Sequence, residues 1–260
     1  MVIKNRIKRY LPKWILLIHR AVFRARLNWP QQIRYYKECL LGQSPYARVT
    51  LNAHKICLGA HDGEWCVAED LLSEKPVVLS FGIGTDISWD LDMINKYNAE
   101  VYAFDPTPIS LQWLSKKQLP DNFNVIPLGI SDTNGIVKFG LPVNHGVSFS
   151  IDHSGVSQRV EKCEVRTFQF MLESLGITKA DIVKLDIEGT EYKVLEDILS
   201  SNISITQVLI EFHHRLFVDE GVSMTRNAFQ LLAKHGYQLF YRSPRGLEYC
   251  FAKPAGNISK

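Results

Sequence analysis

The stretch that most constrains how this 260-residue chain folds is residues 76–106, which reads PVVLSFGIGTDISWDLDMINKYNAEVYAFDP. The apolar run VVLSF predicts a buried strand, which stops at Gly82 and Gly84. Apolar residues at helical spacing follow, and a second apolar run, VYAF, ends at Asp105. Strand, glycine turn, helix, strand and acid in this order predict the first βαβ unit of a nucleotide-binding, Rossmann-like sheet.

The glycine turn indicates which ligand this unit binds. Gly82 and Gly84 let the backbone approach a ligand closely, and Asp105, 21 residues after Gly84, is placed to accept hydrogen bonds from both hydroxyls of a ribose. A dinucleotide fingerprint needs a third glycine, which is missing here. Asp86 would repel a pyrophosphate, whereas it could cap the helix or face a cationic amino-acid group. S-adenosylmethionine therefore fits better than a dinucleotide; the alternative is that the glycines serve only the backbone turn.

A second group of polar residues follows two later strands. Asp186 and Glu188 come after the apolar run IVKL, and Glu211 and His213 come after VLI. Ligands of an open parallel sheet bind beyond the carboxyl ends of its strands, so we expect these side chains at the same edge as the glycine turn. Our first candidate for a general base is His213, because an ordinary imidazole titrates near neutrality; Asp186 is the second, and Glu211 completes the catalytic set. The acids could instead hold a divalent cation or only cap helices, and no metal site is predicted.

The end of a third strand offers a further cofactor contact. Ser131 and Asp132 follow this strand, and either could bond the adenine amino group or form an ordinary turn. The Asn-Gly pair after them predicts a hairpin that joins residues 125–130 with residues 136–139.

Two later segments bear on the substrate and on the edge of the sheet. The polar, glycine-spaced loop 143–158 is where we expect substrate contacts, through His145 and Ser148, with Glu188 as a further candidate. After a last helix, two strands around a turn at residues 243–246 predict an antiparallel edge.

Residues 38–75 are expected to form a cap or accessory segment beside the cofactor strand. The turn-type cluster HDGEW precedes residues 67–72, which predict a short helix. Five cysteines without a C-x-x-C pair favour free thiols in a reducing compartment. Cys57 and Cys66 lie near two histidines, but the spacing matches no standard zinc site, and the apolar context predicts buried thiols.

Residues 1–37 are expected to form a basic arm. They contain ten Lys or Arg and no acid, whereas residues 38–260 carry 20 basic and 27 acidic side chains. Within the arm, residues 12–27 predict an amphipathic helix with Trp14 on its apolar side. Residues 1–27 could thus bind an anionic membrane surface peripherally or pack on the enzyme body. The longest apolar run in this predicted helix is too short to span a bilayer. We therefore expect a cytoplasmic protein without a signal peptide.

The rest of the chain favours one large α/β domain at residues 76–260. A hydrophobic content of 46% is enough for one substantial core. We expect a mostly parallel, twisted sheet with helices on both faces and an antiparallel C-terminal edge. No aromatic-rich nucleic-acid recognition module is evident, and the pattern does not indicate an oligomeric state.

With these motifs in view, the chain resembles the FkbM-type methyltransferases, a branch of the Rossmann-like class I enzymes that use S-adenosylmethionine. The resemblance rests on VVLSFGIGTD, VYAFDP, VIPLGISD, VKLDIEGTE and LIEFH, of which the DIEG segment followed by Glu191 is the most specific. It implies O-methylation of a hydroxyl on a sugar, glycoconjugate or small metabolite. We expect the cofactor contacts at Ser80, Phe81, Gly82, Gly84, Asp86, Asp105, Ser131, Asp132 and Asp186.

The first motif departs from the family pattern at two positions. The family usually has an acid two residues before its first glycine, where this chain has Ser80, and Asp86 replaces the last small residue. The SFGIG variant resembles methyltransferase-like proteins of animals.

The expected mechanism is an in-line displacement at the cofactor's methyl group, in which alignment supplies most of the rate gain. The alternatives are an NAD-dependent oxidoreductase and a non-catalytic cofactor-binding module held on membranes by its basic arm.

Overall fold

The computed structural model describes residues 28–60, 63–140, 150–151, 160–217, 219–254 and 256. The chain divides into two compact units, of which the larger contains residues 47–242 and the chain after residue 246. In the smaller unit, residues 28–40 are helical. The helix expected at residues 12–27 lies outside the described residues, so the interpretation of the arm stays a prediction. None of the described helices is both long and apolar enough to cross a membrane.

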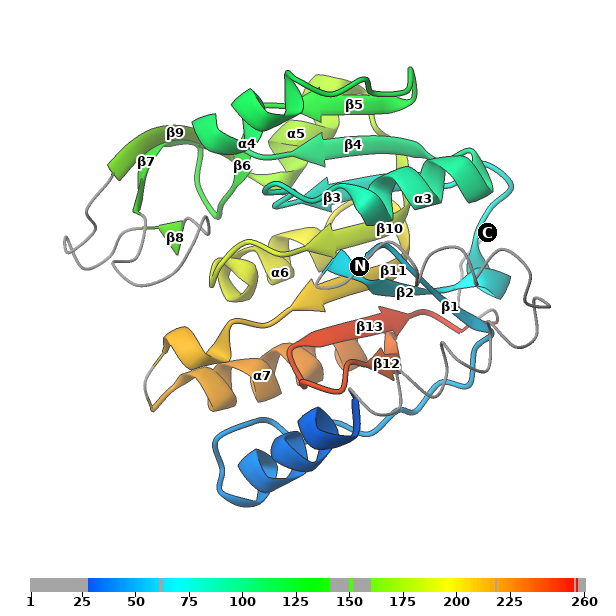
Figure 1. Ribbon diagram of the computed structural model, residues 1–260, viewed down its shortest axis with the longest axis vertical. Helices are drawn as coiled ribbons and strands as arrows, with labels where there is room; N and C mark the ends of the chain where they lie inside the picture. The colour runs from blue at the N-terminus through cyan, green and yellow to red at the C-terminus, as the bar shows by residue number, and fades with distance from the viewer. Residues whose placement is uncertain are drawn as a thin grey trace, which may run out of the picture. The chain divides into compact units, whose positions relative to one another are not determined.

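A seven-stranded sheet forms the centre of the larger unit (Figure 1). Its strand order is β12-β13-β11-β10-β3-β4-β5, and the neighbours from β11 to β5 are parallel. Only β13 runs against both of its neighbours. This arrangement confirms the predicted mostly parallel sheet with an antiparallel C-terminal edge. The strands are β3 (Val77–Phe81), β4 (Glu100–Phe104), β5 (Phe123–Ile126), β10 (Lys179–Leu185), β11 (Ser204–Glu211), β12 (Gln238–Arg242) and β13 (Glu248–Ala252).

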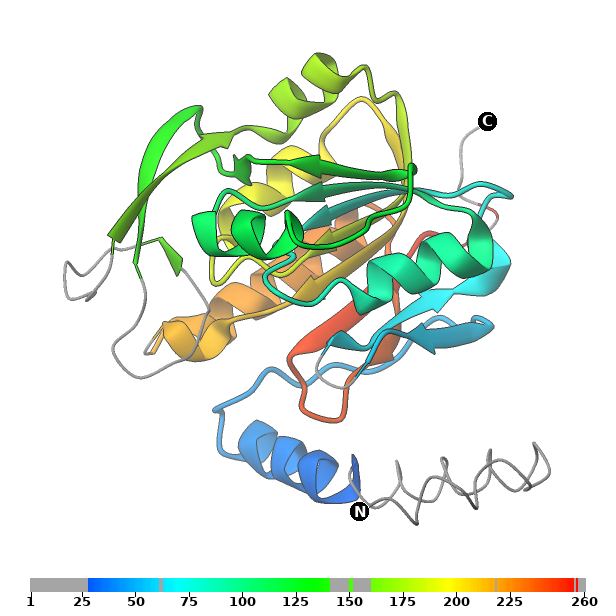
Figure 2. The ribbon, with the colours of Figure 1, turned by 45° about the horizontal axis from the view of Figure 1, so that its top comes forward.

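Helices cover both faces of this sheet, as Figure 2 shows. Side chains alternate along a strand, so Val78 packs with the core under α3 and α4, whereas Leu79 and Phe81 pack with the core under α5, α6 and α7. Both cores are needed because the inner strands are buried on both faces, as parallel strands usually are. The helices are α3 (Ser88–Tyr97), α4 (Pro108–Leu114), α5 (Phe168–Leu175), α6 (Glu191–Leu199) and α7 (Gly221–Lys234), and a 3-10 turn, η3, spans His214–Leu216.

A separate four-stranded sheet corrects the predicted hairpin. Its order is β6-β9-β7-β8, so β9 lies between the two strands that the hairpin would have joined. One reason lies in Asn134, whose side-chain oxygen accepts a hydrogen bond from the backbone N–H of Thr167 at 2.8 Å, just past the end of β9. The Asn-Gly turn is thereby tied to β9. The strands are β6 (Gly129–Ile130), β7 (Gly135–Gly140), β8 (Ser150–Ile151) and β9 (Val160–Arg166).

Residues 55–68, within the predicted accessory segment, form a β-hairpin, which corrects two further predictions. β1 (Lys55–Leu58) pairs antiparallel with β2 (Trp65–Ala68), and the 3-10 turn η2 (Glu69–Leu71) follows, where a short helix had been predicted at residues 67–72. Cys57 and Cys66 lie directly opposite each other, with Cα atoms 3.9 Å apart, and form a disulfide instead of two free thiols. The basis for expecting only reduced cysteines is therefore removed.

One side chain of the central sheet holds this hairpin. Gln207 is fully buried on β11, and its side-chain oxygen accepts a hydrogen bond from the Ala68 N–H at 2.8 Å. Its side-chain nitrogen donates to the Ala68 carbonyl at 2.9 Å. The amide thus satisfies both backbone groups of one residue in β2, as a neighbouring strand would.

Candidate active site

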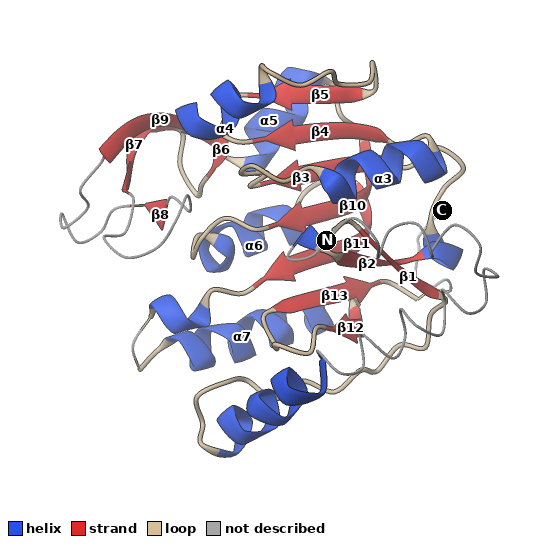
Figure 3. Cartoon of the chain, viewed as in Figure 1, coloured by secondary structure: helices blue, strands red, loops and turns tan. Residues whose placement is uncertain are grey.

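The predicted cofactor turn lies at the carboxyl end of β3, where β3, β4 and β10 point the same way (Figure 3). Gly82 and Gly84 have φ values of 77° and 53°, which favour glycine. A Cβ at Gly82 would lie 1.7 Å from the Asp186 carbonyl oxygen, whereas a Cβ at Gly84 would meet nothing within 4 Å. Gly82 is therefore needed for the close packing of two strand ends, a reason that the sequence pattern did not show.

Asp86 and Asp105, the two acids predicted to contact the cofactor in the first βαβ unit, hold the local backbone. The Gly84 N–H donates to Oδ2 of Asp105 at 2.9 Å, and the N–H and hydroxyl of Thr107 donate to its Oδ1 at 2.9 and 2.6 Å. Asp86 accepts a hydrogen bond from the N–H of Ser88, the first residue of α3, at 2.8 Å, although the N-cap of this helix is Ile87 and not Asp86. Oδ1 of Asp105 already accepts two bonds, whereas Oδ2 can still accept another, so the contact of Asp105 with a ribose stays a prediction.

A cavity of about 540 Å³ opens at this edge of the sheet. Most of the predicted cofactor residues line it: Phe81, Gly82, Gly84, Asp86, Asp105 and Asp186. Ser80 is fully buried but is not part of the lining. Ser131 and Asp132 are also described and do not line the cavity; the Ser131 hydroxyl donates to Asp132 at 3.1 Å. Their predicted contact with adenine therefore has no support from the cavity.

The lining fits a polar ligand such as S-adenosylmethionine. Trp89 Nε1 and Asp90 Oδ1 belong to lining residues, are buried, and have no hydrogen-bond partner among the described residues. Buried polar groups are normally paired, so a donor and an acceptor of this kind indicate that a bound molecule completes them. Apolar walls at Phe104, Ile130 and Phe139 complete the space.

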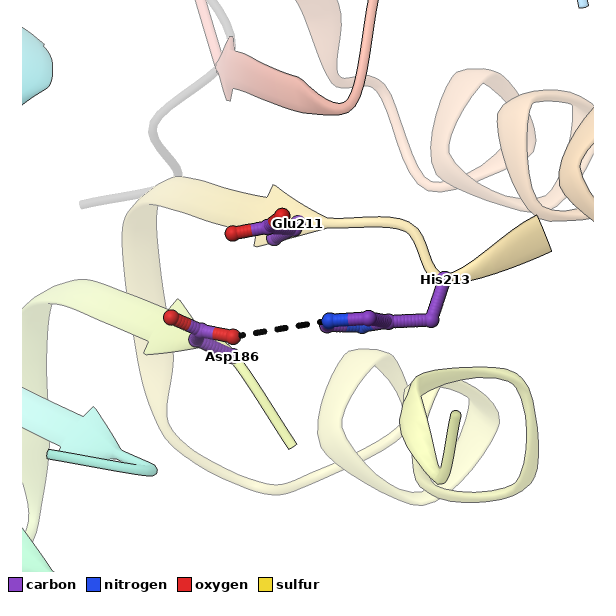
Figure 4. Close-up of side chains that lie close together, drawn as sticks. All are labelled: Asp186, Glu211 and His213. Atoms are coloured by element: carbon purple, nitrogen blue, oxygen red, sulfur yellow. Dashed lines mark ion pairs between the residues drawn. The ribbon is translucent and has the colours of Figure 1, made fainter. Parts of the chain in front are cut away.

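The predicted catalytic residues come together beyond β10 and β11 (Figure 4). His213 Nε2 lies 3.8 Å from a carboxylate oxygen of Asp186 and 3.4 Å from one of Glu188. Ligand atoms of Asp186, Glu211 and His213 all lie within 4.8 Å of one another. Two successive strands thus deliver these groups to one place, as predicted. His145 and Ser148, the other predicted substrate contacts, lie outside the described residues.

Comparison with known proteins identifies the family. The model of the methyltransferase FkbM domain matches residues 58–239. The chain belongs to the FkbM methyltransferase family. This confirms the resemblance to the FkbM-type methyltransferases.

Individual relatives of this FkbM methyltransferase are distant. It is 27% identical over 159 residues to the hexuronic acid methyltransferase AglP of Haloferax volcanii, a match that covers 55% of this chain and 64% of AglP. It is 23% identical over 161 residues to the human probable methyltransferase-like protein 24, covering 61% of this chain and 37% of the relative. The chain thus spans less than two thirds of either protein. The crystal structure of human methyltransferase-like protein 13 in complex with SAH aligns with a TM-score of 0.42 and 12% identity, over 73% of this chain and 80% of that one.

Glu191 is the residue of this FkbM site to which sequence analysis assigned no role. It is fully buried at the start of α6, and its Oε1 lies 2.8 Å from Nδ1 of His213. The same oxygen accepts hydrogen bonds from the backbone N–H groups of Ile187 and Gly189 at 3.1 and 3.2 Å. Glu191 therefore orients both the imidazole and the turn that carries Glu188. Its place in the DIEGTE segment was the only signal in the sequence.

The surroundings of His213 change the role expected for it. Burial alone would lower the pKa of His213, but the hydrogen bond to Glu191 and the charges of Glu191, Glu188 and Asp186 raise it to about 10. At neutral pH the imidazole is therefore protonated and cannot accept a proton. The ordinary titration near neutrality, on which its choice as general base rested, does not apply in this cluster.

A divalent cation is the other group that this cluster could hold. Carboxylate oxygens and an imidazole nitrogen are common ligands, and Asp186, Glu211 and His213 offer one atom each, all within 4.8 Å of one another. Glu191 would orient the histidine from behind, as carboxylates often do for metal-binding imidazoles. A cation there would take the place of the proton on Nε2 of His213.

The titration of His213 should be visible in stability. Because its pKa is raised from about 6.5 to about 10, the stabilisation that it provides is complete below pH 6.5 and is lost as the pH rises towards 10. We expect the difference in unfolding free energy between wild type and His213→Gln, measured by urea denaturation in EDTA, to be largest at pH 6 and to shrink steadily to pH 10. His235→Gln, at the half-buried residue that follows α7 and lies outside this cluster, is the control. A difference that does not change with pH would contradict this interpretation.

Proposed function

We propose that this FkbM methyltransferase transfers a methyl group from S-adenosylmethionine to a hydroxyl oxygen of a sugar, glycoconjugate or small metabolite. The observation that carries the proposal is that two residues belong both to the cavity and to the acidic cluster. Asp186 and Glu188 line the cavity and also face His213. Carboxylates accept hydrogen bonds from hydroxyls, so the cluster can position an alcohol beside the donor. The relative AglP, a hexuronic acid methyltransferase, supports a sugar as the acceptor class.

In the proposed mechanism, this chain's residues align the two reactants and remove one proton. S-adenosylmethionine supplies an electrophilic methyl group on a sulfonium. The Gly82–Gly84 turn and Asp105 would hold the donor, which fixes the direction from which the acceptor must approach. Asp186 is the proposed general base, because it lines the cavity and its carboxylate lies 3.8 Å from Nε2 of His213, at the place where the acceptor hydroxyl would meet the cluster. His213 holds Asp186 and Glu188 in position, and Glu211 would contact the acceptor.

The activity test should report the kind of bond formed. We expect the purified chain, incubated with methyl-labelled S-adenosylmethionine and a panel of neutral and acidic glycosides, to place label in a product that survives mild alkali, because a methyl ether is stable and a methyl ester is not. Asp186→Asn should lose this incorporation. Label that alkali releases would show carboxyl methylation instead. Binding of S-adenosylmethionine without transfer to any acceptor in the panel or in a cell extract would favour the non-catalytic binding module.

A further inference from the structure

One part of the cavity carries buried charges that the proposed mechanism does not use. Lys184 lies on β10 directly beside Ser80 of β3, in the two central strands of the sheet. Asp90 reaches the same region from α3, and the tryptophans Trp65 and Trp89 complete it. The exposed fraction is 5% for Lys184 and 1% for Asp90. A lysine and an aspartate buried this deeply are costly unless their charges are compensated.

Within the protein, this compensation is incomplete. Asp90 Oδ1, Ser80 Oγ and Trp89 Nε1 are buried and have no hydrogen-bond partner in the part of the chain that the structure describes. Among the described residues, the ammonium of Lys184 donates one long hydrogen bond, 3.5 Å to the Gly82 carbonyl, and lies 5.1 Å from the centre of the Trp65 ring. Its charge also acts on Asp90, but burial outweighs that attraction and raises the pKa of Asp90. Two unpaired polar atoms of cavity-lining residues, on Asp90 and Trp89, beside a weakly held cation are unusual for a folded core. They match a site that a ligand completes.

The charges define the chemistry of that ligand. A molecule that satisfies both groups needs a cation for Asp90 and an anion for Lys184, close together on one small group. An α-amino acid has this form, with an ammonium and a carboxylate on the same carbon. Both residues line the cavity beside Gly82 and Gly84, the turn that would hold the rest of the methyl donor.

We infer that Asp90 and Lys184 bind the amino-acid end of S-adenosylmethionine, Asp90 through its ammonium and Lys184 through its carboxylate. This inference rests on the proposed methyl donor and is independent of the acceptor. It also accounts for Ser80, which stands where the family usually has an acid. Here the acidic side chain, Asp90, comes from the helix α3, and the strand position keeps a hydroxyl beside it. Asp86, at the helix start, is already engaged with Ser88.

The test separates the amino-acid end from the rest of the cofactor. Titration calorimetry would compare S-adenosylmethionine, its decarboxylated form, which keeps the ammonium, and 5′-methylthioadenosine, which lacks the amino-acid end. We expect Lys184→Met to weaken S-adenosylmethionine about ten- to a hundredfold and to leave the decarboxylated form unchanged. Asp90→Asn should weaken both. Neither variant should change the affinity for 5′-methylthioadenosine.

Controls keep the result decisive. Lys75→Met and Asp121→Asn make the same chemical changes at described positions that do not line the cavity, and should bind all three ligands as wild type does. Lys184→Gln replaces Lys184→Met if the latter does not fold, as judged by circular dichroism. Equal losses for all three ligands, or no loss for any, would overturn the inference. If the variants show the predicted pattern of ligand affinities but the protein methylates no acceptor, the inference is supported and the proposed function is not. If the wild-type protein does not bind S-adenosylmethionine, both are overturned.

Discussion

Asp186→Asn should lower the turnover number of methyl transfer by about 10²- to 10⁴-fold, the usual contribution of a general base. The amide keeps the shape of the side chain but cannot take the proton of the acceptor hydroxyl. The pKa of about 10 for His213 leaves that residue unable to replace it at neutral pH. Affinity for S-adenosylhomocysteine should change little, because the contact of Asp186 with Gly82 is made by its backbone carbonyl, which the substitution keeps.

Two measurements check this prediction, labelled methyl transfer for turnover and calorimetry for binding. Asp121→Asn is the matched control, since Asp121 is exposed and does not line the cavity. If turnover stays near the wild-type value, Asp186 is not the base. If affinity for S-adenosylhomocysteine falls as far as turnover does, Asp186 serves the cofactor and the acceptor's proton leaves by another route.

Gly82→Ala should be far more damaging than Gly84→Ala, although both glycines have positive φ. The added methyl at Gly82 would lie 1.7 Å from the backbone carbonyl oxygen of Asp186, which can yield only if β3 and β10 separate at their ends. We expect a loss of more than about 4 kcal/mol in unfolding free energy, within the range that marks exceptional substitutions. At Gly84, open space leaves only the left-handed backbone strain of about 1 to 2 kcal/mol.

Thermal and urea unfolding of the two alanine variants would measure this difference directly. Gly84→Ala should lower the melting temperature by about 2 to 8 °C, given the usual shift per kcal/mol for a chain of this size. Gly82→Ala should unfold far below wild type or not fold at all. Similar losses for both variants would mean that backbone strain, and not the contact between the two strand ends, makes Gly82 necessary.

The sequence predicted the elements that depend on local pattern. The strand at residues 77–81, the glycine turn and the acid at Asp105 follow from hydrophobic periodicity and turn chemistry, and the structure has them at the predicted places. The mostly parallel sheet with its antiparallel C-terminal edge also follows, because strands that alternate with helices favour parallel pairing.

The features that were predicted wrongly or not at all depend on contacts between residues that are distant in the chain. β7 pairs with β9, some 25 residues later, and no local signal distinguishes that from a hairpin with the preceding strand. Asp90 and Lys184 are charged residues at buried positions of α3 and β10, and no role was predicted for them. A charged residue among buried apolar neighbours was the signal in the sequence that could have identified them. The pKa of His213 depends on Glu191, which is 22 residues away and meets it only through the fold.

The attachment of the β1–β2 hairpin through Gln207 affects how the shape of the cavity can change during evolution. Trp65, which forms one wall of the cavity, belongs to a hairpin that meets β11 through a side-chain amide and not through a backbone ladder. Changes of length or sequence within the hairpin would therefore reshape that wall without shifting the register of any strand in the central sheet. Selection could adjust the pocket from this appended piece while the strand ends that carry Asp105, Asp186 and Glu211 stay in place.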